Sequence, residues 1–422
     1  MSKTKVLADA ACGGHGAPAL SVADARARIL ATVPPVAGFE KIALRSALGR
    51  VLAAEIVSPT DVPSHTNSAM DGYALNSDDL PDKGTTELTV IGTSWAGRPF
   101  ADKVSRGECV RIMTGASVPP GTDTVIMQEQ VELDGNRVRI GSGHKPGQNV
   151  RAAGEDMKRG TVVLSAGKLL LPPELGLLAS LGVAEVIVKR RVRVAFFSTG
   201  DELRSIGEPL SAGEIYDSNR YTLYGMLSRL GIDIIDMGVV RDDRDATERA
   251  FIEAGTSADV VITSGGVSVG EADYVKETLD KVGKVDFWQI AMKPGRPLAF
   301  GAVRDAVFFG LPGNPVSVMV TFYQFVEPAL RRMMGHADVE PAATFKVRCA
   351  SRLKKSPGRT EYQRAILERT PEGELVVRST GQQGSGLLHS MSVGNCFVIL
   401  PHDAATVEAG AWVDVQPFHG II

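Results

Sequence analysis

The chain lacks the features that mark several large classes of protein. Its net charge at pH 7 is only −3, so it has no excess of basic residues with which to bind nucleic acid or an anionic membrane. No apolar run approaches the length of a membrane span. Residues 1–18 are small and polar, without the charged-then-apolar layout of a signal peptide, and we expect them to form a flexible tail.

Cysteine and histidine are sparse and scattered. The four cysteines, Cys12, Cys109, Cys349 and Cys396, have neither metal-type nor redox-type spacing, and the seven histidines show no ligand spacing. We therefore expect reduced thiols in a cytoplasmic protein, and no zinc site.

The length of 422 residues is enough for two to four domains. Helical spacing of apolar residues predicts a helix over residues 21–33 with Ser21 as its N-cap, and a short one over 46–54. Another helix is expected to begin at Leu171-Pro172-Pro173 and to end near Gly182. We assign residues 19–60 and 147–188 to a discontinuous, α-rich N-terminal domain.

Two segments consist of short β-type runs separated by turns. The first, residues 61–146, carries such runs at 88–91, 109–113, 124–127 and 137–140, and we predict a small β domain there. The second, residues 338–422, carries them at 344–349, 362–367, 374–377, 396–400 and 412–417. This second module is predicted to form a small β-barrel-like domain.

Between these β modules, residues 189–337 alternate strands with helices. Strands are predicted over 192–198, 232–239, 258–262, 287–292 and 306–309, and a last helix from near Pro315 that bends or breaks at Pro328. Such alternation is typical of a doubly wound parallel α/β sheet. Ligands of these sheets bind at the carboxyl ends of the strands.

The most informative segment lies at one of those strand ends, at residues 263–274 (TSGGVSVGEADY). A buried strand runs into a glycine-rich turn, with Ser264, Gly265 and Gly266, that opens a helix. Such a turn can aim backbone N–H groups at a phosphate, and Asp273 can hold a divalent cation beside it. The alternative is that the glycines only permit a tight turn.

The other predicted strand ends also carry glycine, acids or bases. Together they would place carboxylates (Glu202, Asp242 and Asp273) and cations (Lys293 and Arg296) on one rim. Carboxylates gather a hard cation such as magnesium, while lysine and arginine bind oxyanions. A rim with both suits phosphoryl chemistry, although each residue taken alone can be a cap, a turn or a solvated charge.

At this point the sequence resembles the molybdopterin molybdotransferases (the MoeA family), which include the C-terminal domain of gephyrin. The resemblance runs from about Ser21 to the C-terminus, with several long motifs in family order. The motifs are NSAMDGYA at 67–74, RIMTGA at 111–116, GED at 154–156, STGDE at 198–202, the glycine-rich segment at 263–274, MKPGRP at 292–297, LPGNPVS at 311–317 and GQQGS at 381–385. One departure is Gln289, which stands where some members carry lysine.

The resemblance implies an elongated homodimer of four-domain subunits that inserts molybdate into adenylylated molybdopterin, with magnesium, and releases AMP. It implies that Glu202, Asp242 and Asp273 handle metal and phosphates. Asp71, Thr114 and Asp156 would belong to the cleft face contributed by the other modules. The implied molybdate and pterin-phosphate set is Ser264, Gly265, Gly266, Lys293, Arg296, Pro312, Pro315, Ser317, Arg359 and Ser385. Transient contacts with the molybdopterin adenylyltransferase and with acceptor apoenzymes are also implied.

Two rival functions remain to be weighed. The partner enzyme that adenylylates molybdopterin from ATP shares the α/β domain, but the flanking modules with their own motifs argue against that activity. A receptor-anchoring scaffold, a role that gephyrin also has, is disfavoured because the chain has no long linker and no fused second enzyme domain. The sequence does not distinguish molybdate from tungstate.

Overall fold

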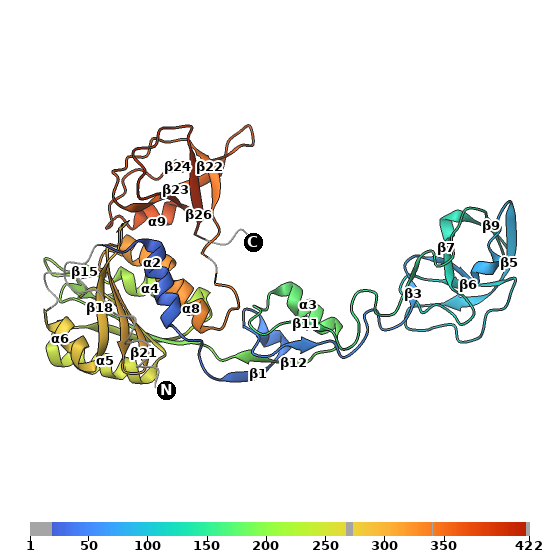
Figure 1. Ribbon diagram of the computed structural model, residues 1–422, viewed down its shortest axis with the longest axis horizontal. Coiled ribbons are helices and arrows are strands. Elements are labelled where there is room, and N and C mark those ends of the chain that lie inside the picture. The colour runs from blue at the N-terminus through green and yellow to red at the C-terminus, as the bar shows by residue number, and fades with distance from the viewer. Residues whose placement is uncertain (1–18, 267–272, 340, 419–422) are drawn as a thin grey trace.

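The computed structural model describes residues 19–266, 273–339 and 341–418. The chain is elongated (Figure 1), with an α/β domain and a β-barrel stacked at one end, a small domain in the middle and a second β domain at the far end. No helix in the described ranges is long and apolar enough to cross a membrane. Cys109, Cys349 and Cys396 are buried free thiols, while Cys12 lies outside the described residues.

The α/β domain is built on a six-stranded sheet in the order β16-β13-β17-β21-β20-β18. The first four strands are parallel to one another, and β20 runs antiparallel to both of its neighbours, β21 and β18. The strands are β16 (Asp233–Val240), β13 (Arg193–Thr199), β17 (Val260–Ser264), β21 (Ala306–Leu311), β20 (Pro297–Val303) and β18 (Gly283–Gln289). The α/β fold class is confirmed. The strand expected over 287–292 ends earlier, and β20 was not predicted.

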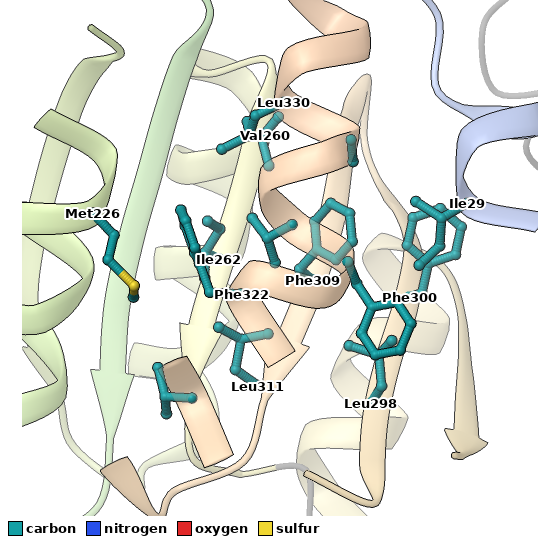
Figure 2. Close-up of a cluster of buried hydrophobic side chains, with 14 of the residues drawn as sticks. Ile29, Met226, Val260, Ile262, Leu298, Phe300, Phe309, Leu311, Phe322 and Leu330 are labelled. Carbon is teal, nitrogen blue, oxygen red and sulfur yellow. The ribbon is translucent and has the colours of Figure 1, made fainter. Parts of the chain in front are cut away.

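Helices cover both faces of this sheet, as in a doubly wound fold. One face carries α4 (Ser218–Arg229), α7 (Pro315–Thr321) and α8 (Glu327–Met333), and the other carries α5 (Arg244–Ser257) and α6 (Asp273–Val282). Figure 2 shows the core of the first face, where Ile262, Phe309 and Leu311 of the sheet meet Phe322. On the second face, Phe251 packs edge-on against Phe197 and Phe308. Burial on both faces explains why the central strands read as continuous apolar runs.

The first described helix, α2 (Val22–Thr32), belongs in space to the α/β domain rather than to the N-terminal domain to which we assigned it. Ser21 is its N-cap, with Oγ accepting from the Asp24 N–H at 3.0 Å, as predicted. Its buried residues Ala25 and Ile29 join the core of the α/β sheet (Figure 2). Apolar spacing identified the helix, but it cannot indicate which core the apolar face enters.

The predicted break near Pro328 is a π-helical segment, η4 (Phe322–Val326), between α7 and α8. Proline has no N–H to give to the carbonyl four residues back, which is that of Gln324. That carbonyl instead accepts from Arg26 Nε at 3.0 Å, and Arg26 Nη2 donates to Gln324 Oε1 at 2.6 Å. The carbonyl that the helix break leaves without a donor is therefore the one that anchors α2 to the α/β domain.

The middle domain is less helical than predicted. Its strands pair as β1 (Phe39–Ala43) with β12 (Glu185–Lys189) and β2 (Ile56–Val57) with β11 (Val162–Leu164). Its α-helix is α3 (Pro172–Ser180), which begins and ends as expected. The helix expected over 46–54 is wrong: a 3-10 turn, η1 (Leu44–Ala47), leads into bridges from Val51 and Leu52 to other segments.

The far domain is a six-stranded β sheet in the order β7-β4-β6-β5-β9-β8, which confirms the β prediction. Short strands β3 (Asn67–Ser68) and β10 (Val150–Arg151) pair where the chain enters and leaves it, and 3-10 turns η2 (Ser77–Asp79) and η3 (Gln128–Gln130) follow two of its strands. The sheet strands are β4 (Gly72–Leu75), β5 (Thr85–Ser94), β6 (Glu108–Ile112), β7 (Thr124–Met127), β8 (Val131–Asp134) and β9 (Arg137–Gly141).

The C-terminal domain is a closed five-stranded barrel, as predicted, because β23 pairs with both β24 and β25. The short strand β19 (Met292–Lys293) of the α/β segment adds to β23 in parallel, so the two domains share one sheet edge. The barrel elements are β22 (Phe345–Cys349), β23 (Thr360–Arg369), β24 (Leu375–Ser379), α9 (His389–Val393), β25 (Cys396–Leu400) and β26 (Trp412–Pro417).

Candidate active site

A cavity of about 330 Å³ lies at the carboxyl ends of the parallel strands. Its wall comes from the ends of β13 and β17, the loop after β21, the start of α4, and the strand pair β14 (Leu203–Arg204) and β15 (Ile215–Tyr216). The lining residues are Thr199, Glu202, Leu203, Ile215, Tyr216, Asp217, Ser218, Asn219, Ser264, Gly265, Gly313, Asn314 and Pro315. This is the position at which open α/β sheets bind ligands.

The glycine-rich turn is one wall of the cavity. Gly265 has φ +92°, and a Cβ there would meet the Thr199 carbonyl oxygen at 2.8 Å. Gly265 N–H donates to the Leu311 carbonyl at 3.1 Å. Glycine is therefore needed at 265 both for the backbone conformation and for the close approach of neighbouring strand ends. Residues 267–272 and the side chain of Asp273 lie outside the described part of the structure.

Asn219 joins three segments of the wall, a role that sequence reasoning missed. Its Nδ2 donates to Ser264 Oγ at 2.8 Å and to the Gly313 carbonyl at 2.7 Å. Asp217, two residues earlier, is the N-cap of α4, and its Oδ1 accepts from the Arg220 N–H at 3.1 Å. The sequence signal that could have identified Asn219 is its position, because it is a second polar residue in the first turn of a capped helix that begins at a strand end.

Acidic side chains gather beside the cavity. Gly200 has φ +145°, and a Cβ there would meet a Glu202 carboxylate oxygen at 2.5 Å, so the carboxylate folds back over the end of β13. The next strand end is tied to it, because Asp242 N–H donates to Asp201 Oδ1 at 3.3 Å. The described residues contain no cluster of three or more metal-type side chains.

The predicted basic residues lie along the join between α/β domain and barrel. Lys293 Nζ is 3.5 Å from Glu361 Oε1, across the β19–β23 pairing. Arg359 is exposed and directly precedes Thr360, the partner of Met292. Arg296 Nη2 donates to Gln289 Oε1 at 2.7 Å, so Gln289 orients a neighbouring cation.

Glu361 holds Lys293 in place from a buried position. Glu361 is only 4% exposed. Gln363 Nε2 donates to Glu361 Oε2 at 2.9 Å. Gln363 also donates to the Lys354 carbonyl at 2.8 Å. A buried carboxylate needs such partners, and the exposed ammonium of Lys293 is thereby fixed at the domain junction.

The barrel reaches the cavity through the loop that carries Ser385. The Ser385 carbonyl accepts from the Val316 N–H at 3.1 Å, beside Pro315 on the cavity wall. Pro312 directly precedes the lining residue Gly313. Ser317 is only 4% exposed, and its carbonyl lies near Gly295 of the MKPGRP loop. Ser317 is therefore buried in the wall between the Ser385 loop and the MKPGRP loop, and it does not lie on an open surface.

Three family models match the chain in order. They are the MoeA N-terminal region (domain I and II) over residues 20–182, a probable molybdopterin binding domain over 195–332, and the MoeA C-terminal region (domain IV) over 346–418. A molybdopterin molybdenumtransferase of Haemophilus influenzae is 46% identical over 404 residues, 96% of this chain and 100% of that protein. The chain belongs to the MoeA family.

Two further relatives support the same placement. The gephyrin of Dictyostelium discoideum is 34% identical, over 89% of this chain and 58% of that protein. A crystal structure of the molybdopterin biosynthesis moeA protein from Pyrococcus horikoshii is 30% identical, with a TM-score of 0.83 over 95% of this chain and 100% of that chain. The multidomain architecture described above is thus that of a MoeA protein.

Within this MoeA chain, the motif residues of the far domain lie apart from the cavity. Asp71 Oδ1 accepts from Thr114 N–H and from Thr114 Oγ1, both at 2.7 Å. These two bonds, first from the backbone and then from the side chain, hold the pKa of Asp71 below its usual range. Asp156 is exposed near the entrance to the same domain. Figure 1 places that domain at the opposite end of the molecule from the α/β sheet, so one chain does not bring all predicted site residues together.

Proposed function

We propose that this chain is a molybdopterin molybdotransferase, which inserts molybdate into adenylylated molybdopterin and releases AMP. The observation that carries the proposal is the docking of the barrel's Ser385 loop on the wall of the α/β cavity, through Val316. A relative named molybdopterin molybdenumtransferase matches the whole architecture at 46% identity. A cytoplasmic location, and transient contacts with the adenylyltransferase and with acceptor apoenzymes, belong to this proposal.

In this proposal, each part of the site has one task. The Ser264–Gly265–Gly266 turn receives phosphate oxygens. Lys293, Arg296 and Arg359, on the strands and loops of the domain junction, receive molybdate. Molybdate is a tetrahedral dianion, and cationic N–H donors make short, strong hydrogen bonds to such oxygens. Glu361 keeps the Lys293 ammonium aimed at one place while the oxyanion arrives.

Magnesium fits the acidic side of the cavity. Carboxylate oxygens are its preferred protein ligands, and Glu202 and Asp242 supply them from neighbouring strand ends joined through Asp201. We propose that these two residues, with Asp273, hold the ion. When bound, it would neutralise negative charge on the phosphates of the substrate.

We further propose that the working site is shared between two copies of the chain. Asp71, Thr114 and Asp156 are exposed and far from their own chain's cavity, so they can serve a cavity only in another copy. The middle domain exposes Phe39, Leu48 and Ile187, apolar side chains that an interface would cover. Closed two-fold dimers are the commonest symmetric assembly.

The activity is tested by mixing the purified protein with adenylylated molybdopterin, molybdate and Mg²⁺ and measuring AMP. We expect AMP release that depends on molybdate and is lost in Glu202→Gln. A parallel reaction with ATP and molybdopterin should yield no adenylylated product. Adenylylation from ATP without molybdate-dependent AMP release would overturn the assignment in favour of the partner enzyme's activity.

The shared site is tested by complementation between inactive variants. Asp71→Asn and Glu202→Gln chains should each be inactive alone. After unfolding and refolding together, random pairing into two-fold dimers should restore about a quarter of the wild-type sites, because each mixed dimer contains one intact site. A mixture that stays inactive, although mixed dimers are recovered through a different affinity tag on each variant, would exclude a site built from both chains.

A further inference from the structure

Three buried oxygen atoms on the cavity wall have no hydrogen-bond donor within the described structure. They are Thr199 Oγ1, Asp217 Oδ2 and Asn219 Oδ1, and all three residues line the cavity. Asp217 is 3% exposed. Eleven unpartnered buried side-chain atoms occur in the described ranges, and three of them share this one cavity. Because an unpaired buried polar atom destabilises the fold, such a concentration indicates a ligand that supplies the donors.

The neighbouring contacts fix the chemical character of the Asp217 and Asn219 oxygens. Asp217 Oδ1 already caps α4 by accepting from Arg220 N–H, which leaves Oδ2 as the free carboxylate oxygen. Asn219 cannot have its amide reversed, since its nitrogen donates to the Gly313 carbonyl, which can only accept. The cavity therefore presents a carboxylate oxygen and an amide oxygen, both acceptors.

Two acceptors on residues of one cavity wall suit a ligand edge with two neighbouring N–H donors. The 2-amino-4-oxo edge of a pterin offers such a pair, the 2-amino group and N3–H. Each hydrogen-bonding edge of adenine instead sets its amino donor beside a ring-nitrogen acceptor, which would face one of these oxygens with a repulsive contact. The acceptor pair thus matches the pterin half of an adenylylated pterin better than its adenine half.

We propose that Asp217 and Asn219 recognise the pterin ring, with Asp217 Oδ2 and Asn219 Oδ1 accepting from its donor edge at the carboxyl ends of β13 and β17. The assignment rests on the proposed function for the identity of the pterin substrate. It adds two specificity-determining residues to that function. Thr199, which lines the same cavity, has an Oγ1 that can donate as well as accept and so can make a third bond.

The test uses Asp217→Asn and Asp217→Ser in the full-length protein. Asparagine and serine are both good N-caps, so α4 keeps its cap in each variant. In Asp217→Asn the amide oxygen must take over the cap, and the amide NH₂ then replaces the free acceptor with a donor. Asp217→Ser removes the free oxygen without adding a donor. Binding of molybdopterin is measured by equilibrium ultrafiltration, and binding of AMP and of Mg²⁺ by calorimetry.

We expect Asp217→Asn to weaken molybdopterin binding by about 10- to 100-fold, and Asp217→Ser by less, because only the asparagine opposes an N–H with another N–H. AMP and Mg²⁺ affinities and the melting temperature should stay at wild-type values. Unchanged molybdopterin affinity in Asp217→Asn would overturn the proposal. A parallel loss of AMP affinity would also do so by showing general damage to the cavity, and a selective loss of Mg²⁺ affinity by making Asp217 a metal ligand.

The outcome is separable from that of the proposed function. If the wild-type protein binds molybdopterin but releases no AMP from adenylylated molybdopterin and molybdate, the transferase assignment is wrong. Pterin recognition is then still decided by the binding measurements. A wild-type protein that turns over normally, with Asp217→Asn binding molybdopterin equally well, defeats only the recognition.

Discussion

Replacing Arg364 with methionine should destabilise the barrel and loosen the loop that meets the cavity. Arg364 is 1% exposed, and its guanidinium donates to Ser390 Oγ at 2.9 Å, to the Gln383 carbonyl at 3.2 Å and to the Gly384 carbonyl at 2.8 Å. Burial lowers the pKa of Arg364 to about 10, so it remains charged at neutral pH. The Gln383 and Gly384 carbonyls fix the chain immediately before Ser385, and Ser390 Oγ fixes it five residues after.

The expected loss follows from those three bonds. Hydrogen bonds from a charged donor contribute about 1.5–3 kcal/mol each, and the buried Ser390 hydroxyl would lose its donor. Methionine is apolar and offsets part of the lost stability, because it avoids the desolvation of a buried charge. We expect a net loss of about 3–5 kcal/mol in the unfolding free energy of the barrel.

The assay exploits the distribution of tryptophan, with Trp95 in the far domain, Trp288 in the α/β domain and Trp412 in the barrel. With Trp95 and Trp288 changed to phenylalanine, Trp412 fluorescence in urea reports on the barrel alone. Arg378→Met is the matched control, since Arg378 forms an exposed pair with Glu368 that contributes at most about 1 kcal/mol. If Arg364→Met loses no more stability than this control, the guanidinium does not support the loop and the reasoning is refuted.

Three further predictions concern single residues. Glu361→Gln should raise the molybdate KM by about 5- to 20-fold with a smaller effect on kcat, because Lys293 loses its charged partner; steady-state kinetics with an unchanged KM would contradict this. Gly265→Ala should lower the unfolding free energy by about 1–3 kcal/mol and weaken AMP binding. The control is Gly49→Ala, at a similar φ but with open space around it, which should leave AMP binding intact. Burial, and secondarily Arg331, lowers the pKa of His336 from 6.5 to about 4. Because the unfolded chain binds a proton at this histidine first, stability should fall as the pH drops from 6.5 to about 4. Melting temperatures of His336→Gln should fall less steeply over that range, and an equal slope would count against the assignment.

Much of the fold and the identity of the family were determined by the sequence itself. Alternating apolar runs and turns predicted the two β modules and the α/β domain between them, because local periodicity follows directly from which face of a strand or helix is buried. Capping chemistry placed the N-cap of the first helix at Ser21, since that bond is made within three residues along the chain.

Other features depended on contacts between distant segments. The docking of α2 on the α/β core through Arg26 and the addition of β19 to the barrel both join residues that no local pattern links. The same holds for Asn219, whose contacts to Ser264 and Gly313 appear only when three strand ends meet. The motif residues Asp71 and Asp156 read as part of one site in the sequence, yet the fold holds them at the far end of the chain. Sequence thus determined the family and the candidate site residues, while tertiary structure decided which of these candidates meet, because proximity arises from packing between domains and not from spacing along the chain.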